Sequence, residues 1–193
     1  FFKYWLVKYL KHEVFILKNW RNVVVQSDAD KKVMLENLEK ADLKNVCILP
    51  NGKKNFSNTL NFKRTHFYNR PIDILIWCDN WKSSTKYISD IINTLEASTQ
   101  NYKVQVLGKI TRSLKKKIDI SKIEVLNWVE DIHEHLDGVK FLIAPGFKKF
   151  GLINRIVDSL FAGCITISDD TGFNGIPCFQ NGTHGFILSD GSG

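Results

Sequence analysis

The sequence has few of the residues that build small disulfide-bonded or metal-binding domains. Its cysteines, Cys47, Cys78, Cys164 and Cys178, are far apart, and none belongs to a C-x-x-C motif. Three of them lie in or beside apolar runs typical of strands, so we expect reduced thiols in packed strands. The spacing therefore predicts neither a disulfide frame nor a zinc site.

A second metal pattern, His133-Glu134-His135, is also weak. The two histidines are two positions apart on a predicted short helix, so their side chains diverge by about 200°. We expect no metal site here.

Long apolar runs are missing as well. No stretch approaches the ~20 apolar residues of a membrane-spanning helix, and the N-terminal stretch lacks the charged, apolar and small-residue regions of a signal peptide. We therefore expect a cytoplasmic protein.

The charge balance favours anionic partners. The chain has 27 basic and 20 acidic residues, a net charge of +7, with basic residues spread over its length. Nucleotide diphosphates or an anionic membrane surface fit this balance. Nucleic acid is not expected, because no basic stripe alternates with stacking aromatics and no zinc-finger or helix-turn-helix pattern is present.

The hydrophobic pattern alternates between short strands and single helices. Residues 72–78 form a nearly continuous apolar run, typical of a parallel strand covered on both faces. This alternation predicts crossover units and a Rossmann-like, doubly wound parallel α/β sheet. Further strands are predicted at 23–26, 45–49, 103–107, 123–129, 139–144, 164–168 and 185–188, and helices at 28–43, 84–98, 131–136 and 151–161, with a basic helical turn at 111–117.

Residues 1–20 predict an extra N-terminal helix ahead of a domain at 21–193. Its aromatic and apolar surface allows three interpretations: packing on this domain's own core, an interdomain helix, or a basic helix lying on a membrane surface. Liposome sedimentation with and without this segment would decide the last of these.

Ligands of open parallel sheets bind at the carboxyl ends of the strands. Three predicted loops lie there: 79–86, 127–131 and 145–151. The first places Lys82 and Lys86 with several hydroxyl groups around a helix start, which suits a diphosphate. The alternative is an ordinary solvated helix cap with two surface lysines.

The loop at 145–151 leads into a helix with one polar edge, formed by Asn154, Arg155 and Asp158. Asp158 would lie about 10 Å along the axis from Gly151. A carboxylate there could accept hydrogen bonds from ribose hydroxyls while Arg155 neutralises phosphate. The alternative is a surface ion pair between Arg155 and Asp158.

Residues 150–177, FGLINRIVDSLFAGCITISDDTGFNGIP, resemble the donor-binding C-terminal domain of the group 1, retaining GT-B glycosyltransferases. Arg155, Asp158, Gly163 and Gly175 occupy positions that match that family's motif. Weaker matches follow in the family's order at 24–27 with 49–52, at Lys82 and Lys86, and at 125–131.

The resemblance implies transfer of a sugar from a nucleotide diphosphate sugar to a glycan or lipid-linked acceptor, with retention. Asp158 would bind the ribose, and Trp128 and Val129 would contact the base. The resemblance implies no cofactor and leaves the catalytic residue unknown. The diphosphate would be bound by Lys82, Lys86, Arg155 and the backbone of Gly151 and Leu152.

The sequence departs from the family at the sugar-binding positions. Phe150 replaces the first of two glutamates, and the second is the shorter Asp158. No acceptor-binding domain has a counterpart, so we expect part of a longer enzyme. The alternative function is a non-catalytic Rossmann-like binding module derived from such an enzyme.

Overall fold

The computed structural model describes residues 22–37, 45–49, 64–77, 84–108, 110–112, 116, 118–119, 121–145, 153–176 and 179–188. The predicted N-terminal helix lies outside these residues, and the expected domain boundaries remain a prediction. The chain divides into two compact units. One comprises Phe1–Gly52, Phe150–Leu152 and Asn174–Ile176, and the other Lys53–Lys149, Ile153–Phe173 and Pro177–Gly193.

The first unit contains a two-stranded parallel sheet with one crossover helix. Strand β1 (Asn22–Val25) pairs with β2 (Asn45–Ile48), and α2 (Asp28–Asn37) connects them. Ser27 caps α2, because its Oγ accepts a hydrogen bond from the Asp30 amide at 3.1 Å. Cys47 is a free thiol but exposed, so the prediction that it is packed is wrong. It lies on a two-stranded sheet, outside the large core.

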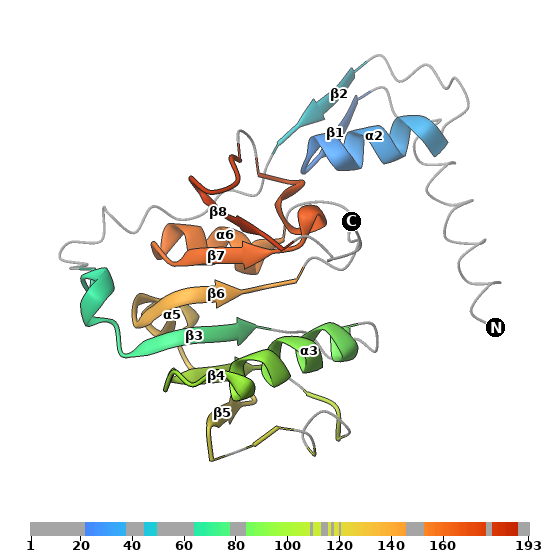
Figure 1. The fold of residues 1–193 in the computed structure, drawn as a ribbon. Helices are drawn as coiled ribbons and strands as arrows, with labels where there is room; N and C mark the ends of the chain where they lie inside the picture. The colour runs from blue at the N-terminus through green and yellow to red at the C-terminus, as the bar shows by residue number, and fades with distance from the viewer. Residues whose placement is uncertain are drawn as a thin grey trace. The chain divides into compact units, whose positions relative to one another are not determined.

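The second unit is built on a six-stranded sheet in which every neighbouring pair is parallel (Figure 1). The spatial order is β5-β4-β3-β6-β7-β8. This is the predicted Rossmann-like α/β fold. The strands are β3 (Ile72–Trp77), β4 (Val104–Leu107), β5 (Ile123–Leu126), β6 (Val139–Ile143), β7 (Ile165–Ser168) and β8 (Gly185–Ile187).

Helices cover both faces of this sheet (Figure 1). Ile88 and Ile92 of α3 (Ser84–Ala97) pack on one face against Ile76 and Val106. Helices α5 (Ile132–Asp137) and α6 (Asn154–Phe161) lie on the other face, where Ser159 of α6 hydrogen bonds to Thr166 of β7. Burial from both sides explains the continuous apolar run in β3. Within the described ranges, no helix combines the length and apolar character needed to cross a bilayer.

Several element boundaries differ from the predictions. Strand β5 ends at Leu126, and α6 begins at Asn154 with Ile153 as its N-cap. Asp131 is the N-cap of α5, and its carboxylate accepts hydrogen bonds from the amides of His133 and Glu134. These bonds hold the pKa of Asp131 below its usual range. Two 3-10 helices, η2 (Phe67–Asn69) and η3 (Asp170–Phe173), were not predicted.

The C-terminal end of α6 forms a Schellman motif. The Cys164 amide donates to the Ser159 carbonyl and the Gly163 amide to the Leu160 carbonyl. Gly163 adopts φ +72°, a conformation that costs glycine little. The glycine at this motif position therefore has a structural role.

Arg70 ties the amino end of β6 to this helix end. Its side chain is 5% exposed, and Nη1 donates to the Val139 carbonyl at 2.7 Å. Nη2 donates to the Ala162 carbonyl at 2.9 Å, where the negative end of the helix dipole favours a cation. Because the guanidinium is buried against carbonyl groups, removing it leaves those acceptors unsatisfied.

A second polar cluster lies under α5. Gln105 of β4 donates from Nε2 to Glu124 of β5 at 2.7 Å. Both alternate with residues of the α3 face, so they point toward the opposite face. The buried Nε2 of His135 on α5 has no hydrogen-bond partner in the part of the chain described here. Burial lowers the pKa of His135, and the Glu124 charge only partly opposes this.

Replacing Arg70 with methionine is expected to lower the free energy of unfolding by roughly 2 to 4 kcal/mol, because charged hydrogen bonds are lost and buried carbonyls remain. Urea denaturation measures this change. Arg112→Met is the matched control, since Arg112 is exposed. Equal stabilities of the two variants would contradict the role assigned to Arg70.

Acidification is expected to destabilise the protein through His135. Burial holds the folded-state pKa of His135 below its ordinary value of 6.5, so the unfolded state binds more protons as pH falls. The contribution of His135 to the free energy of unfolding is complete above its unfolded-state pKa of about 6.5 and decreases as the pH falls below that value. Urea midpoints from about pH 7 to about pH 5 should therefore fall more steeply for the parent chain than for His135→Gln. His66→Gln, at an exposed position, should follow the parent.

Candidate functional site

The candidate site lies where the direction of the chain through the sheet reverses. From β3 the chain adds β4 and β5 on one side, and then returns to add β6, β7 and β8 on the other. The crevice at such a reversal, outside the carboxyl ends of the adjacent strands, is the usual ligand site of open α/β sheets. Here the adjacent strands are β3 and β6, with Ile76 paired to Ile143 near their carboxyl ends.

Arg155 lies at this reversal. It is in the first turn of α6, and its Nη2 donates a hydrogen bond of 2.7 Å to the carbonyl of Pro145, two residues beyond β6. The side chain is 8% exposed. Arg155 therefore places a positive charge beside the start of the loop at 145–151 and also holds that loop's first residue.

Asp158 follows Arg155 by three positions on α6, so the two share one side of the helix. Its side chain is 7% exposed, whereas Asn154 is exposed. The predicted polar edge is thus mostly buried, which argues against the alternative of a surface ion pair. The predicted helix start at Gly151 is about 10 Å from Asp158 along the axis. Because α6 begins at Asn154, Asp158 lies about 6 Å from the observed helix start.

The N-terminus of α6 differs from those of the other capped helices. Ser27 and Asp131 provide side-chain oxygens to the first turns of α2 and α5. Ile153 at the N-cap of α6 provides none. This helix start therefore depends on groups other than its N-cap side chain, in a position where the helix dipole favours an anion.

The remaining predicted diphosphate contacts are not placed by the structure. Lys82, Gly151 and Leu152 lie outside the described residues. Lys86 lies in the first turn of α3, and only its backbone is described. Arg155 is therefore the predicted diphosphate residue whose side chain can be located, and the other contacts remain predictions.

The two predicted base-side residues follow β5. Trp128 is 73% exposed and Val129 is half-buried, on the same carboxyl edge of the sheet. Strand β5 is two positions from β3, about 10 Å at the usual strand spacing. An exposed indole at that distance is accessible to a ligand that extends along the edge from the reversal.

The loop after β7 also belongs to this edge, and sequence reasoning missed it. Ser168 donates from Oγ to the Ala144 carbonyl at 2.6 Å, joining the ends of β7 and β6. A Cβ atom at Gly172 would lie 1.9 Å from that Oγ, so only glycine fits there. Asp169 accepts hydrogen bonds from Thr171 Oγ1 and the Gly172 amide. The run at 169–172, Asp-Asp-Thr-Gly, is typical of a turn and could have indicated this loop from the sequence.

No protein-family model matches the sequence, and no curated protein matches it. Solved structures do match it in fold. TarM superposes with a TM-score of 0.74 at 10% identity, covering 94% of this chain and 36% of that protein. The pneumococcal O-GlcNAc transferase GtfA, solved with UDP and GlcNAc, gives 0.67 at 12% identity, covering 96% and 37%.

A third match is Anabaena Alr3699/HepE, solved with UDP and glucose. Its TM-score is 0.69 at 13% identity, covering 94% of this chain and 53% of HepE. The chain thus spans about a third to a half of the length of these proteins, which have the GT-B fold. At these identities the likeness concerns the fold, and it confirms the predicted resemblance at that level. The chain is therefore similar in fold to one part of these proteins, the Rossmann-like half of a GT-B fold.

Proposed function

We propose that this chain is the donor-binding half of a glycosyltransferase. The reaction would transfer a sugar from a nucleotide diphosphate sugar to a glycan or lipid-linked acceptor, with retention at the anomeric carbon. The observation that carries the proposal is the position of Arg155, held at the carbonyl of Pro145 where the parallel sheet reverses. The GtfA and HepE structures, each solved with UDP, support a nucleotide-sugar donor.

The donor's charge would be met at the loops that leave β3 and β6. Arg155, Lys82 and Lys86 would neutralise the diphosphate, together with backbone N–H groups of Gly151 and Leu152. As the bond to the sugar breaks, negative charge grows on the leaving diphosphate, and fixed positive charge stabilises it without reorganisation. Burial strengthens this effect for Arg155, because fewer water molecules screen it.

The nucleoside would lie along the carboxyl edge. Asp158 would accept hydrogen bonds from the two ribose hydroxyls, since an ionised carboxylate accepts but does not donate. The base would lie near Trp128 and Val129, beyond β5.

The acceptor and the catalytic group would come from residues outside this unit, because the neighbours are two to three times longer than the matched part. We place this chemistry in polysaccharide synthesis in the cytoplasm, with peripheral contact to an anionic membrane surface favoured by the net charge of +7.

One observation favours the alternative of a non-catalytic binding module. Arg155 and Asp158 are both more than nine-tenths buried, and Arg155 already binds a backbone carbonyl. In a module that had lost its sugar site, these residues would simply hold α6 against the loop after β6. Phe150, in place of the family's glutamate, fits that alternative as well. Titration with UDP and GDP separates the two functions, because only a donor domain needs to bind them.

Replacing Asp158 with asparagine, or Lys86 with alanine, is expected to weaken nucleotide diphosphate binding by roughly 1 to 3 kcal/mol, the value of a charge-assisted contact. Isothermal titration with UDP and GDP measures the change. Asp90→Asn and Lys116→Ala, at exposed positions, are the matched controls. Unchanged affinity in both site variants would remove the proposed site, provided that their melting temperatures equal those of the controls.

A thermal-shift screen with UDP, GDP, ADP and CMP sugars is expected to give one nucleotide series that raises the melting temperature. A ligand that binds only the folded state stabilises it by about 2.7 kcal/mol at a hundredfold excess over Kd. The shift should be absent with the corresponding free nucleosides, which lack the phosphates. No shift with any nucleotide sugar would favour the non-catalytic module.

A further inference from the structure

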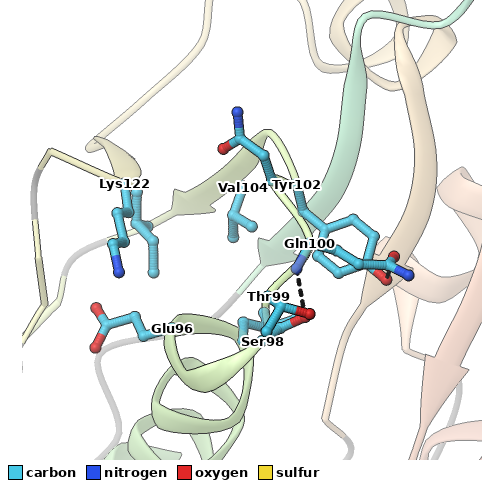
Figure 2. Close-up of a pocket in the computed structure, with 10 residues that line it drawn as sticks. Glu96, Ser98, Thr99, Gln100, Tyr102, Val104 and Lys122 are labelled. Atoms are coloured by element: carbon cyan, nitrogen blue, oxygen red, sulfur yellow. Dashed lines mark hydrogen bonds between the residues drawn. The ribbon is translucent and has the colours of Figure 1, made fainter.

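A cavity of about 240 Å³ lies at the opposite edge of the sheet from the candidate donor site. It is bounded by the C-terminal end of α3, the segment at 98–102, and the amino ends of β4 and β5 (Figure 2). Strand β4 separates the two edges by three residue steps, about 10 Å. A ligand in this cavity is therefore distinct from the diphosphate that we propose to bind at the carboxyl edge.

The cavity combines an apolar floor with polar walls. Leu95, Val104 and Ile123 provide the apolar surface. Figure 2 shows the Lys122 ammonium and the Glu96 carboxylate on one side, with Tyr102 and Gln100 on the other. Further hydrogen-bonding groups come from Ser98, Thr99 and Asn101.

The wall at 98–103 is held in place by its own hydrogen bonds. The Gln100 amide donates to Ser98 Oγ at 3.2 Å, and the Tyr102 hydroxyl bonds to the side-chain carbonyl of Gln100. The Lys103 amide donates to Asp73 Oδ2 at 2.9 Å, which anchors the segment to β3. A ligand would therefore meet a preformed surface and lose little free energy in ordering it.

The opposite wall is anchored as well. Glu96 on α3 accepts a hydrogen bond of 2.9 Å from the Asp119 amide. The Lys122 amide in turn donates to the Asp119 carbonyl at 3.0 Å. These bonds connect the end of α3 to the turn that precedes β5. Both charged side chains of the cavity thus start from fixed backbone positions.

The lining favours a neutral polar ligand. Among the described residues that line it, Lys122 is the one cation and Glu96 the one anion. These charges balance, so a free ion gains little net attraction. The volume is below the ~300–1,000 Å³ of drug-sized sites, which suits a ligand of about one ring. Sugar rings have polar hydroxyls at the edge and apolar C–H faces. The Tyr102 ring and the aliphatic floor match those faces, and the amides and charged groups match the hydroxyls.

We propose that this cavity is a subsite for one neutral sugar residue of a glycan. The inference rests on the proposed function, because a glycan acceptor or product supplies such a residue. Tyr102 would contact a face of the ring, and Asn101, Glu96 and Lys122 would hydrogen bond to its hydroxyls. A glycan held there, away from the donor, stays near the enzyme between transfers and so has a raised effective concentration.

Chemical-shift titration of the isotope-labelled chain tests this proposal. Glucose and N-acetylglucosamine at millimolar concentrations are the probes. Saturable shifts are expected at the amides of Asn101, Tyr102 and Lys122. Tyr102→Leu and Asn101→Ala should each weaken binding about fivefold to tenfold, the loss of roughly one contact. Tyr68→Leu, which changes a tyrosine that is 80% exposed and lies on η2, should not.

Two outcomes would overturn the subsite. One is the absence of saturable shifts at these amides with either sugar. The other is an equal response of these amides to inorganic phosphate, which would indicate an anion site. Titration of the parent chain with UDP keeps the two proposals apart, and Asp158→Asn is expected to weaken only the binding of UDP. Sugar binding without UDP binding would remove only the donor site, and UDP binding without sugar binding would remove only the cavity's role.

Discussion

The parallel pairing of β3 with β6 is the constraint on which the rest of the structure depends. These two strands end side by side at the carboxyl edge of the sheet. After β3 the chain continues to β4 on one side of the pair, and after β6 it continues to β7 on the other. A crevice outside the carboxyl ends of two such strands is the usual ligand site of an open α/β sheet. Arg155 at the carbonyl of Pro145 and Ser168 at the carbonyl of Ala144 fix the neighbouring loops at this opening. The position of the candidate site is therefore a consequence of strand order, and α6 provides its Arg155.

Among the described residues, the buried Arg70 and Arg155 show how differently one residue type is used in this fold. Arg70 donates to the carbonyls of Val139, Ala162 and Gly163, and so closes the amino end of β6 on the end of α6. Arg155 lies at the other end of the same helix. Burying a guanidinium is costly unless it is hydrogen bonded, so each must retain its acceptors. At the carboxyl edge the same requirement leaves positive charge where an anionic ligand would bind.

Two edges of one sheet offer different chemistry. The carboxyl edge has helix starts and Arg155, which favour phosphate. The amino edge has the end of α3, where the dipole is negative, and a cavity whose charges balance. This polarity follows from parallel strands joined by single helices, because every helix then begins at one edge and ends at the other. The two edges therefore differ in electrostatics, and the proposed anionic donor and neutral glycan residue would bind apart from each other.

The sequence by itself determined the strands, the principal helices and the Rossmann-like class, because hydrophobic period and turn residues are local properties. It placed Arg155 with Asp158 on one side of a helix. It extended β5 past Leu126 and began α6 at Gly151, since apolar residues continue beyond both ends. Only the tertiary structure decided that Arg155 and Asp158 are buried, that Gly172 lies against Ser168, and that α3, residues 98–102 and Lys122 enclose a cavity. Helical periodicity identifies which residues share a face, but what covers that face depends on contacts between segments far apart in the chain.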